Sequence, residues 1–305
     1  MRTWAGTAGA LTLLAGLLTG CGSPASPAGD AGTPHRPLPV DAPIYGVTSD
    51  DGYAAGPLAA SAEHLSRTPT TRLVFDEHVP ATEYQESVRR LRRSSYLMGL
   101  ILDSYYVKEY SATEYADRVT DYLDAFGDQV DIWEIGNEVN GEWLGDPDDV
   151  ITKIASGYDQ AEDRGHRTAM TLYYNPECWE RSDHEMFRWA ETHVPERMRT
   201  GLDYVWISYY EHDCEGQRFG VGHWRGVFDR LHRLFPNSRI GFGETGADPE
   251  SSYRHKADYL RRYYGMPITT PGYVGGYFWW YYRQECLPWD SRKLWSVLDR
   301  ELRTY

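Results

Sequence analysis

Cysteine is scarce in this 305-residue chain, and its four cysteines, Cys21, Cys178, Cys214 and Cys286, lie far apart. Zinc sites usually draw on closely spaced Cys or His pairs, so this spacing argues against a structural zinc centre. The chain also lacks a clustered His, Asp and Glu pattern for another metal, and no glycine-rich phosphate loop follows an early strand. We therefore expect neither a metal nor a cofactor.

Basic residues are also in short supply, with 31 Lys and Arg against 45 Asp and Glu and a formal net charge of −14. This balance argues against a broad surface that binds polyanions, so we expect no nucleic-acid partner. With 41% hydrophobic and 25% charged residues the chain suits one large globular domain, which we expect to be a monomer.

The N-terminus has the pattern of an export signal, with Arg2 followed by the apolar run 8–18, which is too short to span a membrane stably. Residues 18–21, Leu-Thr-Gly-Cys, resemble the lipobox of bacterial lipoproteins. That resemblance implies acylation of Cys21 and a protein attached outside the cytoplasmic membrane through its N-terminal lipid alone. The alternative is an ordinary secretory signal with a coincidental cysteine. We expect residues 1–21 to be signal and lipobox, and the Gly, Ser, Ala and Pro-rich residues 22–43 to be a disordered tether.

From residue 44 onward, apolar strand-like runs alternate with helix-like segments. The predicted strands are 44–48, 70–76, 96–102, 131–138, 168–173, 204–210, 240–246 and 273–282, and the predicted helices are 58–66, 82–93, 111–126, 146–165, 183–193, 224–234, 253–264 and 291–302. Parallel strands need crossover helices, so eight such units predict an α/β fold, a single (β/α)8 TIM barrel over residues 44–305. A doubly wound open sheet is the competitor.

Two of these strands end in a carboxylate. Asp131-Ile132-Trp133-Glu134-Ile135-Gly136-Asn137-Glu138 closes strand four, and Ile240-Gly241-Phe242-Gly243-Glu244 closes strand seven, 106 residues later (244 − 138). Three barrel units of about 30 residues account for that separation, so both carboxylates should lie at the catalytic, carboxyl-terminal face of the barrel. Paired carboxyl groups of this kind are what glycosidic bond cleavage requires.

At this point the chain resembles the retaining glycoside hydrolases of clan A, which are barrels with Asn-Glu at the end of strand four and Glu on strand seven. The matching segments are Trp133 to Glu138, Gly243-Glu244, Ser208-Tyr209-Tyr210, Phe278-Trp279-Trp280 and Arg72. The resemblance implies that Glu138 is the general acid/base, Glu244 the nucleophile and Asn137 a donor to the sugar 2-hydroxyl. It further implies cleavage of β-glycosidic bonds in an extracellular oligo- or polysaccharide.

Glu138 must begin protonated and Glu244 ionised, so their surroundings must differ. Arg72 and the hydroxyl of Tyr209 or Tyr210 are expected to hold Glu244 as the anion, and these three residues are candidates for binding the substrate. For Arg72, a bridge between acids inside the barrel is the alternative to ligand contact. Glu134, on the same face of its strand as Glu138, is expected to be a buried structural carboxylate. Further candidates for the catalytic carboxylates are Glu142 and Glu211.

Aromatic residues make up 14% of the chain, and some are expected to contact sugar. Trp143 and His212 are candidates on loops. Trp279 and Trp280 are candidates on strand eight, of which a regular strand admits only one to the site.

An exported location permits a disulfide, and we favour Cys178–Cys214 because the loops after strands five and six should be neighbours, with Cys214–Cys286 as the alternative.

Gly136 and Val139-Asn140 depart from the usual clan pattern, so the sequence does not indicate one particular family of the clan. Two further functions remain open: a noncatalytic carbohydrate-binding lipoprotein on the same barrel, and a transglycosylase.

Overall fold

The fold is that of a closed parallel barrel, described by a computed structural model that covers residues 37–50 and 55–304. The strands pair in the order β1-β2-β3-β4-β5-β6-β7-β8, and β8 pairs with β1 to close the ring. Their bounds are β1 Ile44–Ser49, β2 Thr70–Val74, β3 Tyr96–Leu100, β4 Ile132–Gly136, β5 Thr168–Tyr173, β6 Tyr204–Tyr209, β7 Arg239–Thr245 and β8 Tyr273–Trp279. The predicted (β/α)8 barrel is confirmed.

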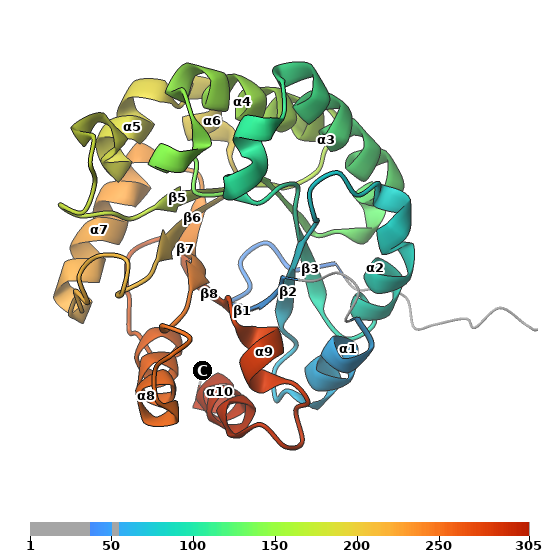
Figure 1. The fold of residues 1–305 in the computed structure, drawn as a ribbon, viewed down its shortest axis with the longest axis vertical. Coiled ribbons are helices and arrows are strands. Elements are labelled where there is room, and N and C mark those ends of the chain that lie inside the picture. Colours follow the sequence, from blue (N-terminus) through green and yellow to red (C-terminus); the bar gives the residue numbers. More distant parts are fainter. Residues whose placement is uncertain (1–36, 51–54, 305) are drawn as a thin grey trace, which may run out of the picture. The chain divides into compact units, whose positions relative to one another are not determined.

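Helices surround the strands in Figure 1 and connect each strand to the next. The α-helices are α1 Ala55–His64, α2 Gln85–Leu91, α3 Ala112–Phe126, α4 Pro147–Asp163, α5 Met186–His193, α6 Glu196–Gly201, α7 Val221–Leu234, α8 Tyr253–Tyr264, α9 Tyr282–Cys286 and α10 Lys293–Thr304. Short 3₁₀ turns include η3 Ser104–Glu109 and η5 Glu142–Leu144, which follow β3 and β4. The sequence patterns did not indicate the short α6 and α9.

Local signals set the starts of the long helices. Ser111 and Glu114 form a capping box at the start of α3, in which each side chain accepts a hydrogen bond from the other residue's backbone N–H. The Asp146 side chain caps α4 by accepting from the backbone N–H groups of Asp148 and Asp149, and Pro147 occupies the first turn, where its missing N–H costs nothing. These capping residues set the first residues of α3 and α4.

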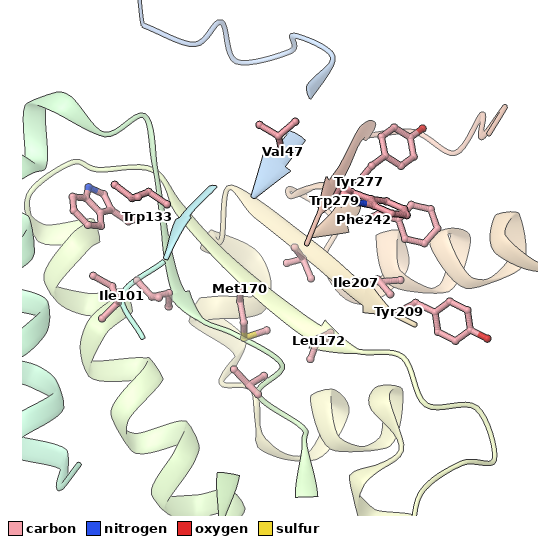
Figure 2. Close-up of a cluster of buried hydrophobic side chains, with 14 of the residues drawn as sticks. Val47, Ile101, Trp133, Met170, Leu172, Ile207, Tyr209, Phe242, Tyr277 and Trp279 are labelled. Atoms are coloured by element: carbon pink, nitrogen blue, oxygen red, sulfur yellow. The ribbon is translucent and has the colours of Figure 1, made fainter. Parts of the chain in front are cut away.

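Two apolar layers hold the barrel together. The larger one fills the space between strands and helices, and Figure 2 shows Met170, Leu172 and Ile207 in it. The smaller one lies inside the barrel and contains Met98, Trp206 and other residues that alternate with the outward-facing ones. Because a parallel barrel covers both faces of each strand, almost every strand residue is buried.

A β-bulge in β7 changes which way its last residues face. Ile207 pairs with Phe242 but Ser208 pairs with Glu244, so Gly243 is an extra residue. Phe242 packs in the outer layer, and strict alternation would have sent Glu244 to the same side. A Cβ on Gly243 would lie 2.4 Å from Cβ of Trp206, so the bulge tolerates only glycine there. The bulge thereby turns Glu244 towards the barrel interior.

The folded domain begins before Ile44, which corrects the predicted extent of the tether. Leu38 is 2% exposed and packs in the inner apolar layer with Met98 and Phe278. Its backbone N–H donates to Oδ1 of Asp131 at 2.8 Å, and its carbonyl accepts from Nη1 of Arg167 at 2.7 Å. Residues 37–43 therefore belong to the folded domain. The buried side chain of Leu38 anchors this segment to the barrel.

The predicted signal peptide, the lipobox with Cys21 and the tether up to residue 36 lie outside the described residues. Within the part of the chain that the structure describes, none of the helices has the length and apolar character needed to cross a membrane.

Candidate active site

A cavity of about 370 Å³ opens at the carboxyl ends of the strands, where barrels carry their chemistry. Its walls come from the carboxyl ends of β5 and β7 and from the residues that follow β3, β4, β6 and β8. The lining residues are Asp103, Ser104, Tyr105, Glu138, Trp143, Tyr173, Tyr210, His212, Asp213, Glu244, Trp280 and Tyr281. Both predicted carboxylates thus line one cavity.

Glu138 lies two residues beyond β4, and its carboxyl group is held by hydroxyls. Ser208 Oγ donates to Oε1 at 2.5 Å and Ser104 Oγ donates to Oε2 at 3.0 Å. Burial, and next the nearby Glu244 carboxylate, raise the pKa of Glu138 well above its ordinary value. Its φ of 48° falls in the left-handed region, an uncommon backbone state that recurs at functional sites. The surroundings of Glu138 therefore favour its protonated form.

Glu244 has a different environment. Arg72 Nη1 donates to its Oε2 at 2.5 Å, and Tyr210 Oη donates to its Oε1 at 2.6 Å. Asn137 Nδ2 adds a longer contact of 3.4 Å to Oε2. Burial and the Glu244 charge raise the pKa of Tyr210 well above its ordinary value, which keeps this hydroxyl a donor. The carboxyl group of Glu244 is thus bound by a guanidinium, a phenol hydroxyl and an amide, and hydrogen bonds from a cation to a carboxyl group are the stronger kind.

Arg72 reaches Glu244 from a fixed position inside the barrel. Its guanidinium also binds Glu134, with Nε to Oε2 at 2.6 Å and Nη2 to Oε1 at 2.8 Å, and both residues are fully buried. Thr171 Oγ1 donates to Oε1 of Glu134 at 2.5 Å. Arg72 therefore bridges two acids inside the barrel and binds Glu244, but it is not among the residues that line the cavity, and Glu134 is a buried structural carboxylate.

Two further acids lie at the cavity wall. Burial raises the pKa of Asp103 to about 6, although the backbone N–H of Tyr105 opposes this, while Glu244 adds to the rise. Burial also raises the pKa of Asp213, whose Oδ1 lies 3.5 Å from Nε2 of His212. With one proton donor, one held anion and additional hydrogen-bond acceptors, the cavity can bind hydroxyl-rich ligands and carry out acid and nucleophile chemistry on them.

The fold has known relatives among solved structures. The chain is similar to the catalytic domain of a GH26 endo-β-1,4-mannanase from Bacillus sp. JAMB-750 (8% identity, TM-score 0.54, 86% of each chain covered). It is similar to a GH5-4 broad specificity endoglucanase from an uncultured bacterium (10%, 0.52, 87% of this chain and 94% of that one). It is also similar to a putative α-L-fucosidase from Bacteroides thetaiotaomicron VPI-5482 (12%, 0.55, 92% and 98%).

These likenesses show a glycosidase-like barrel. At such low identity they concern the fold alone. No protein-family model and no curated protein sequence matches the chain.

Four of the predicted substrate-binding residues line the cavity: Trp143, Tyr210, His212 and Trp280. Trp280 lies over the guanidinium of Arg72, with Cζ 5.6 Å from the ring centroid, and so belongs to the Glu244 side of the cavity. Trp143 belongs to the Glu138 side, because its indole Nε1–H donates to Ser104 at 3.0 Å.

The prediction that Tyr209 and Trp279 contact the substrate is wrong, since both side chains face the outer helices. Tyr209 donates to the carbonyl of Gln217, and Trp279 Nε1–H donates to Glu285 at 2.9 Å; Figure 2 shows both residues in the outer apolar layer. Strand alternation explains the outcome, because Tyr210 and Trp280 each follow them by one residue and point inward.

Neither reserve carboxylate enters the cavity. Glu142 accepts hydrogen bonds from the backbone N–H groups of Glu180 and Arg181, and Glu211 pairs with Arg218 at 2.8 Å. Among residues 37–50 and 55–304, no group of three or more His, Cys, Asp and Glu side chains is arranged to hold a metal.

Sequence reasoning missed the roles of Ser104 and Ser208, which hold Glu138. A signal for Ser208 was present: it is a polar residue inside an apolar strand, two positions before Tyr210, and therefore shares its face. Ser104 and Tyr105 follow β3 in a short turn with no pattern that distinguishes them from ordinary loop residues.

A disulfide joins Cys178 to Cys214, the pair that we favour from the sequence, and Cys286 is buried as a free thiol. Cys214 directly follows His212 and Asp213 in the chain. The bridge therefore ties the loop that carries two wall residues to the loop after β5.

Proposed function

We propose that this protein is a retaining glycoside hydrolase that cleaves β-glycosidic bonds of an extracellular oligo- or polysaccharide by double displacement. The observation that carries the proposal is the contrast between two carboxyl groups in one cavity. Glu138 is held by two hydroxyls and has a raised pKa, whereas Glu244 is bound by Arg72 and Tyr210. Opposite protonation states at the start are what this mechanism needs.

In the first step, Glu138 donates its proton to the glycosidic oxygen while the Glu244 carboxylate attacks the anomeric carbon. The bond to the leaving group breaks, and a glycosyl ester forms on Glu244. In the second step, Glu138 is a carboxylate and removes a proton from water, which attacks the anomeric carbon and releases Glu244. In this proposal Asn137 donates to the sugar 2-hydroxyl, as the resemblance implies, and the 3.4 Å contact of its amide with Oε2 of Glu244 supports that role.

The β-linkage in the proposal is supported by the Asn137-Glu138 and Gly243-Glu244 motifs. The cavity adds aromatic rings on two sides, with Trp280 beside Arg72 and Trp143 beside Glu138. Aromatic faces stack on the apolar faces of sugar rings, so these walls support a saccharide as the ligand.

The test is covalent labelling of the domain with a panel of activated 2-deoxy-2-fluoro-glycosides, followed by peptide mass spectrometry. We expect the label on Glu244, with no label in the E244Q variant. A label on another residue would discard the assigned nucleophile. An active enzyme that no fluorosugar labels and that inverts the anomeric configuration would discard the retaining mechanism.

A second arm tests Glu138. With the E138A variant and an aryl glycoside that needs no protonation, the glycosyl ester should accumulate, and added azide should release a glycosyl azide of retained configuration. Absence of any azide product, with wild-type hydrolysis demonstrated, would remove Glu138 from the acid/base role. A sugar acceptor added to the wild type shows whether transfer competes with hydrolysis.

We also propose that the mature protein is held outside the cytoplasmic membrane by a lipid on Cys21. The support is the segment Leu18-Thr19-Gly20-Cys21 and its position after an apolar run. Labelled fatty acid supplied to expressing bacteria should enter the wild-type protein and not the C21S variant. Equal labelling of the two would contradict the lipoprotein assignment.

A further inference from the structure

A chain of two hydrogen bonds links an aromatic wall of the cavity to Glu138. Trp143 Nε1–H donates to Ser104 Oγ at 3.0 Å, and Ser104 Oγ–H donates to Oε2 of Glu138 at 3.0 Å. Ser104 is 1% exposed, so water does not compete readily for either bond. The three residues come from η5, η3 and the end of β4.

The direction of this chain is set by chemistry. An indole N–H can only donate, whereas a serine hydroxyl has one proton and accepts on its lone pairs. Ser104 therefore accepts from Trp143, and its single proton is directed to Glu138. Removing the indole N–H frees that hydroxyl to rotate away.

Trp143 is itself held in place. Its ring stacks with that of Tyr105 at 5.8 Å between centroids and meets the edge of Tyr173 at 5.3 Å. A Cβ on Gly141 would lie 2.6 Å from Cζ2 of Trp143, so the ring packs directly on the backbone of Gly141. Tyr105 is 64% exposed and extends the aromatic surface outward from Trp143.

The position of this surface identifies what it contacts. The acid of a glycosidase protonates the oxygen of the departing group, so the departing group lies beside the acid. Trp143 and Tyr105 are on the Glu138 side of the cavity, whereas Trp280 is on the side of Arg72 and Glu244.

We propose that Trp143 and Ser104 are positioning residues that aim Glu138 at the leaving-group oxygen, and that Trp143 with Tyr105 stacks on the leaving-group saccharide. This inference rests on the proposed function. The indole of Trp143 then has two roles. Its face stacks on the leaving-group saccharide, and its N–H orients Ser104 and so the carboxyl group of Glu138 that protonates this leaving group.

The experiment compares kcat/KM for S104A and W143F on two substrates that share one glycone. One has a saccharide as leaving group, which needs protonation, and the other has dinitrophenolate, which departs without it. S104A removes only the hydroxyl, because its backbone N–H still donates to Oδ1 of Asn137 at 3.2 Å. W143F keeps an aromatic ring and removes the N–H.

The matched control is W295F. Trp295 also donates its Nε1–H to a buried serine, Ser61, at 2.8 Å, but it lies in α10 and does not line the cavity. A loss that came merely from deleting an indole–serine bond would therefore appear in W295F as well.

General acid catalysis accelerates a reaction by about 10²–10⁴-fold. We expect kcat/KM of S104A on the substrate with a saccharide leaving group to fall on the order of tenfold, a part of that acceleration. The dinitrophenyl substrate should change by no more than about threefold in the same variant, since it needs little acid assistance. W143F should show the same pattern at smaller size. The basic limb of the pH profile should move to higher pH in S104A, because a donor that favours the carboxylate of Glu138 is lost.

A second comparison tests stacking. Y105A should raise KM for substrates whose leaving group is a saccharide and leave the glycosyl fluoride of the same glycone unchanged, because fluoride is too small to reach the ring of Tyr105; the pH profile should stay in place. A KM rise on both substrates would overturn the leaving-group assignment.

Other results separate the two proposals. In one set of results, the wild type hydrolyses glycosides while S104A and W143F behave like W295F, or while these two variants lose activity equally on both substrates. Either result shows that the positioning role is wrong and leaves the proposed function standing. If the wild type hydrolyses no glycoside, the proposed function fails and this inference fails with it.

Discussion

Replacing Arg72 by methionine removes the only cation from a buried cluster of three charges. The Arg72 guanidinium is 0% exposed and binds Glu134 on one side and Glu244 on the other. Burial opposes its charge, but the two carboxylates raise the pKa of Arg72 above its ordinary value, so it stays charged. In R72M both carboxylates lose that partner without gaining access to water.

Removal of one partner from a buried ion pair typically costs about 3–5 kcal/mol of unfolding free energy. For a domain of this size, that corresponds to a melting temperature lower by on the order of 10 °C. The matched control is R197M. Arg197 pairs with Asp159 through two bonds of 2.9 Å, but both side chains are about half exposed, and such pairs contribute less than about 1 kcal/mol.

A double variant separates stability from activity. R72M/E134Q leaves Glu244 as the one buried carboxylate of the cluster, and Glu244 keeps the hydrogen bond from Tyr210. We expect this variant to recover part of the stability lost in R72M. We expect its activity to stay low, because the nucleophile still lacks the cation that favours its ionised form.

Chemical and thermal denaturation of the four proteins, with kcat/KM measured alongside, makes the test. If R72M loses no more stability than R197M, the charge cluster does not hold the barrel as argued. If R72M/E134Q is no more stable than R72M, the loss has a cause other than an uncompensated carboxylate.

Three further predictions follow from the same contacts. Because the folded-state pKa of Glu138 is raised, its contribution to stability is full below the ordinary Glu value of about 4.3 and is lost as pH rises through the raised value. E138Q should therefore gain stability relative to wild type as pH rises across that window, and a pH-independent difference in denaturation midpoints would contradict this. C178S/C214S should lose about 4 kcal/mol, from the loop entropy of a 36-residue separation, and a loss under about 1 kcal/mol in denaturant would refute that estimate. Y210F should lower kcat by about tenfold or more through a hydrogen bond to a charged group worth about 1.5–3 kcal/mol, whereas Y209F should leave kcat unchanged; equal effects would show that the hydroxyl at Tyr210 is not used.

Most of the secondary structure could be predicted from local pattern. The predicted ranges of 168–173 and 253–264 coincide with β5 and α8, and most other boundaries differ by a few residues. Capping residues such as Ser111 and Asp146 act within one turn, so their signal is complete in the sequence. The helix expected over 183–193 is shorter than predicted. A separate 3₁₀ turn covers Ser182–His184, and α5 starts at Met186 because Glu185 caps it.

The pairing of the carboxylates was also readable before the structure. Glu138 and Glu244 each end an apolar run, and their separation matches three barrel units. That argument uses only chain length and strand count. It does not reveal which side chains surround each carboxyl group, and those surroundings set its protonation state.

By itself, the sequence determined the number and order of the strands, the barrel they close and the two carboxylates at its mouth. Only the tertiary structure decided between Tyr209 and Tyr210 and between Trp279 and Trp280. The reason is that the strands of a parallel barrel are covered on both faces, so the outward Tyr209 and Trp279 are of the same residue types as their inward neighbours Tyr210 and Trp280, and residue type does not tell them apart. The extra residue Gly243, which turns Glu244 inward, is likewise defined by pairing with Ser208, a contact between strands that no single segment specifies.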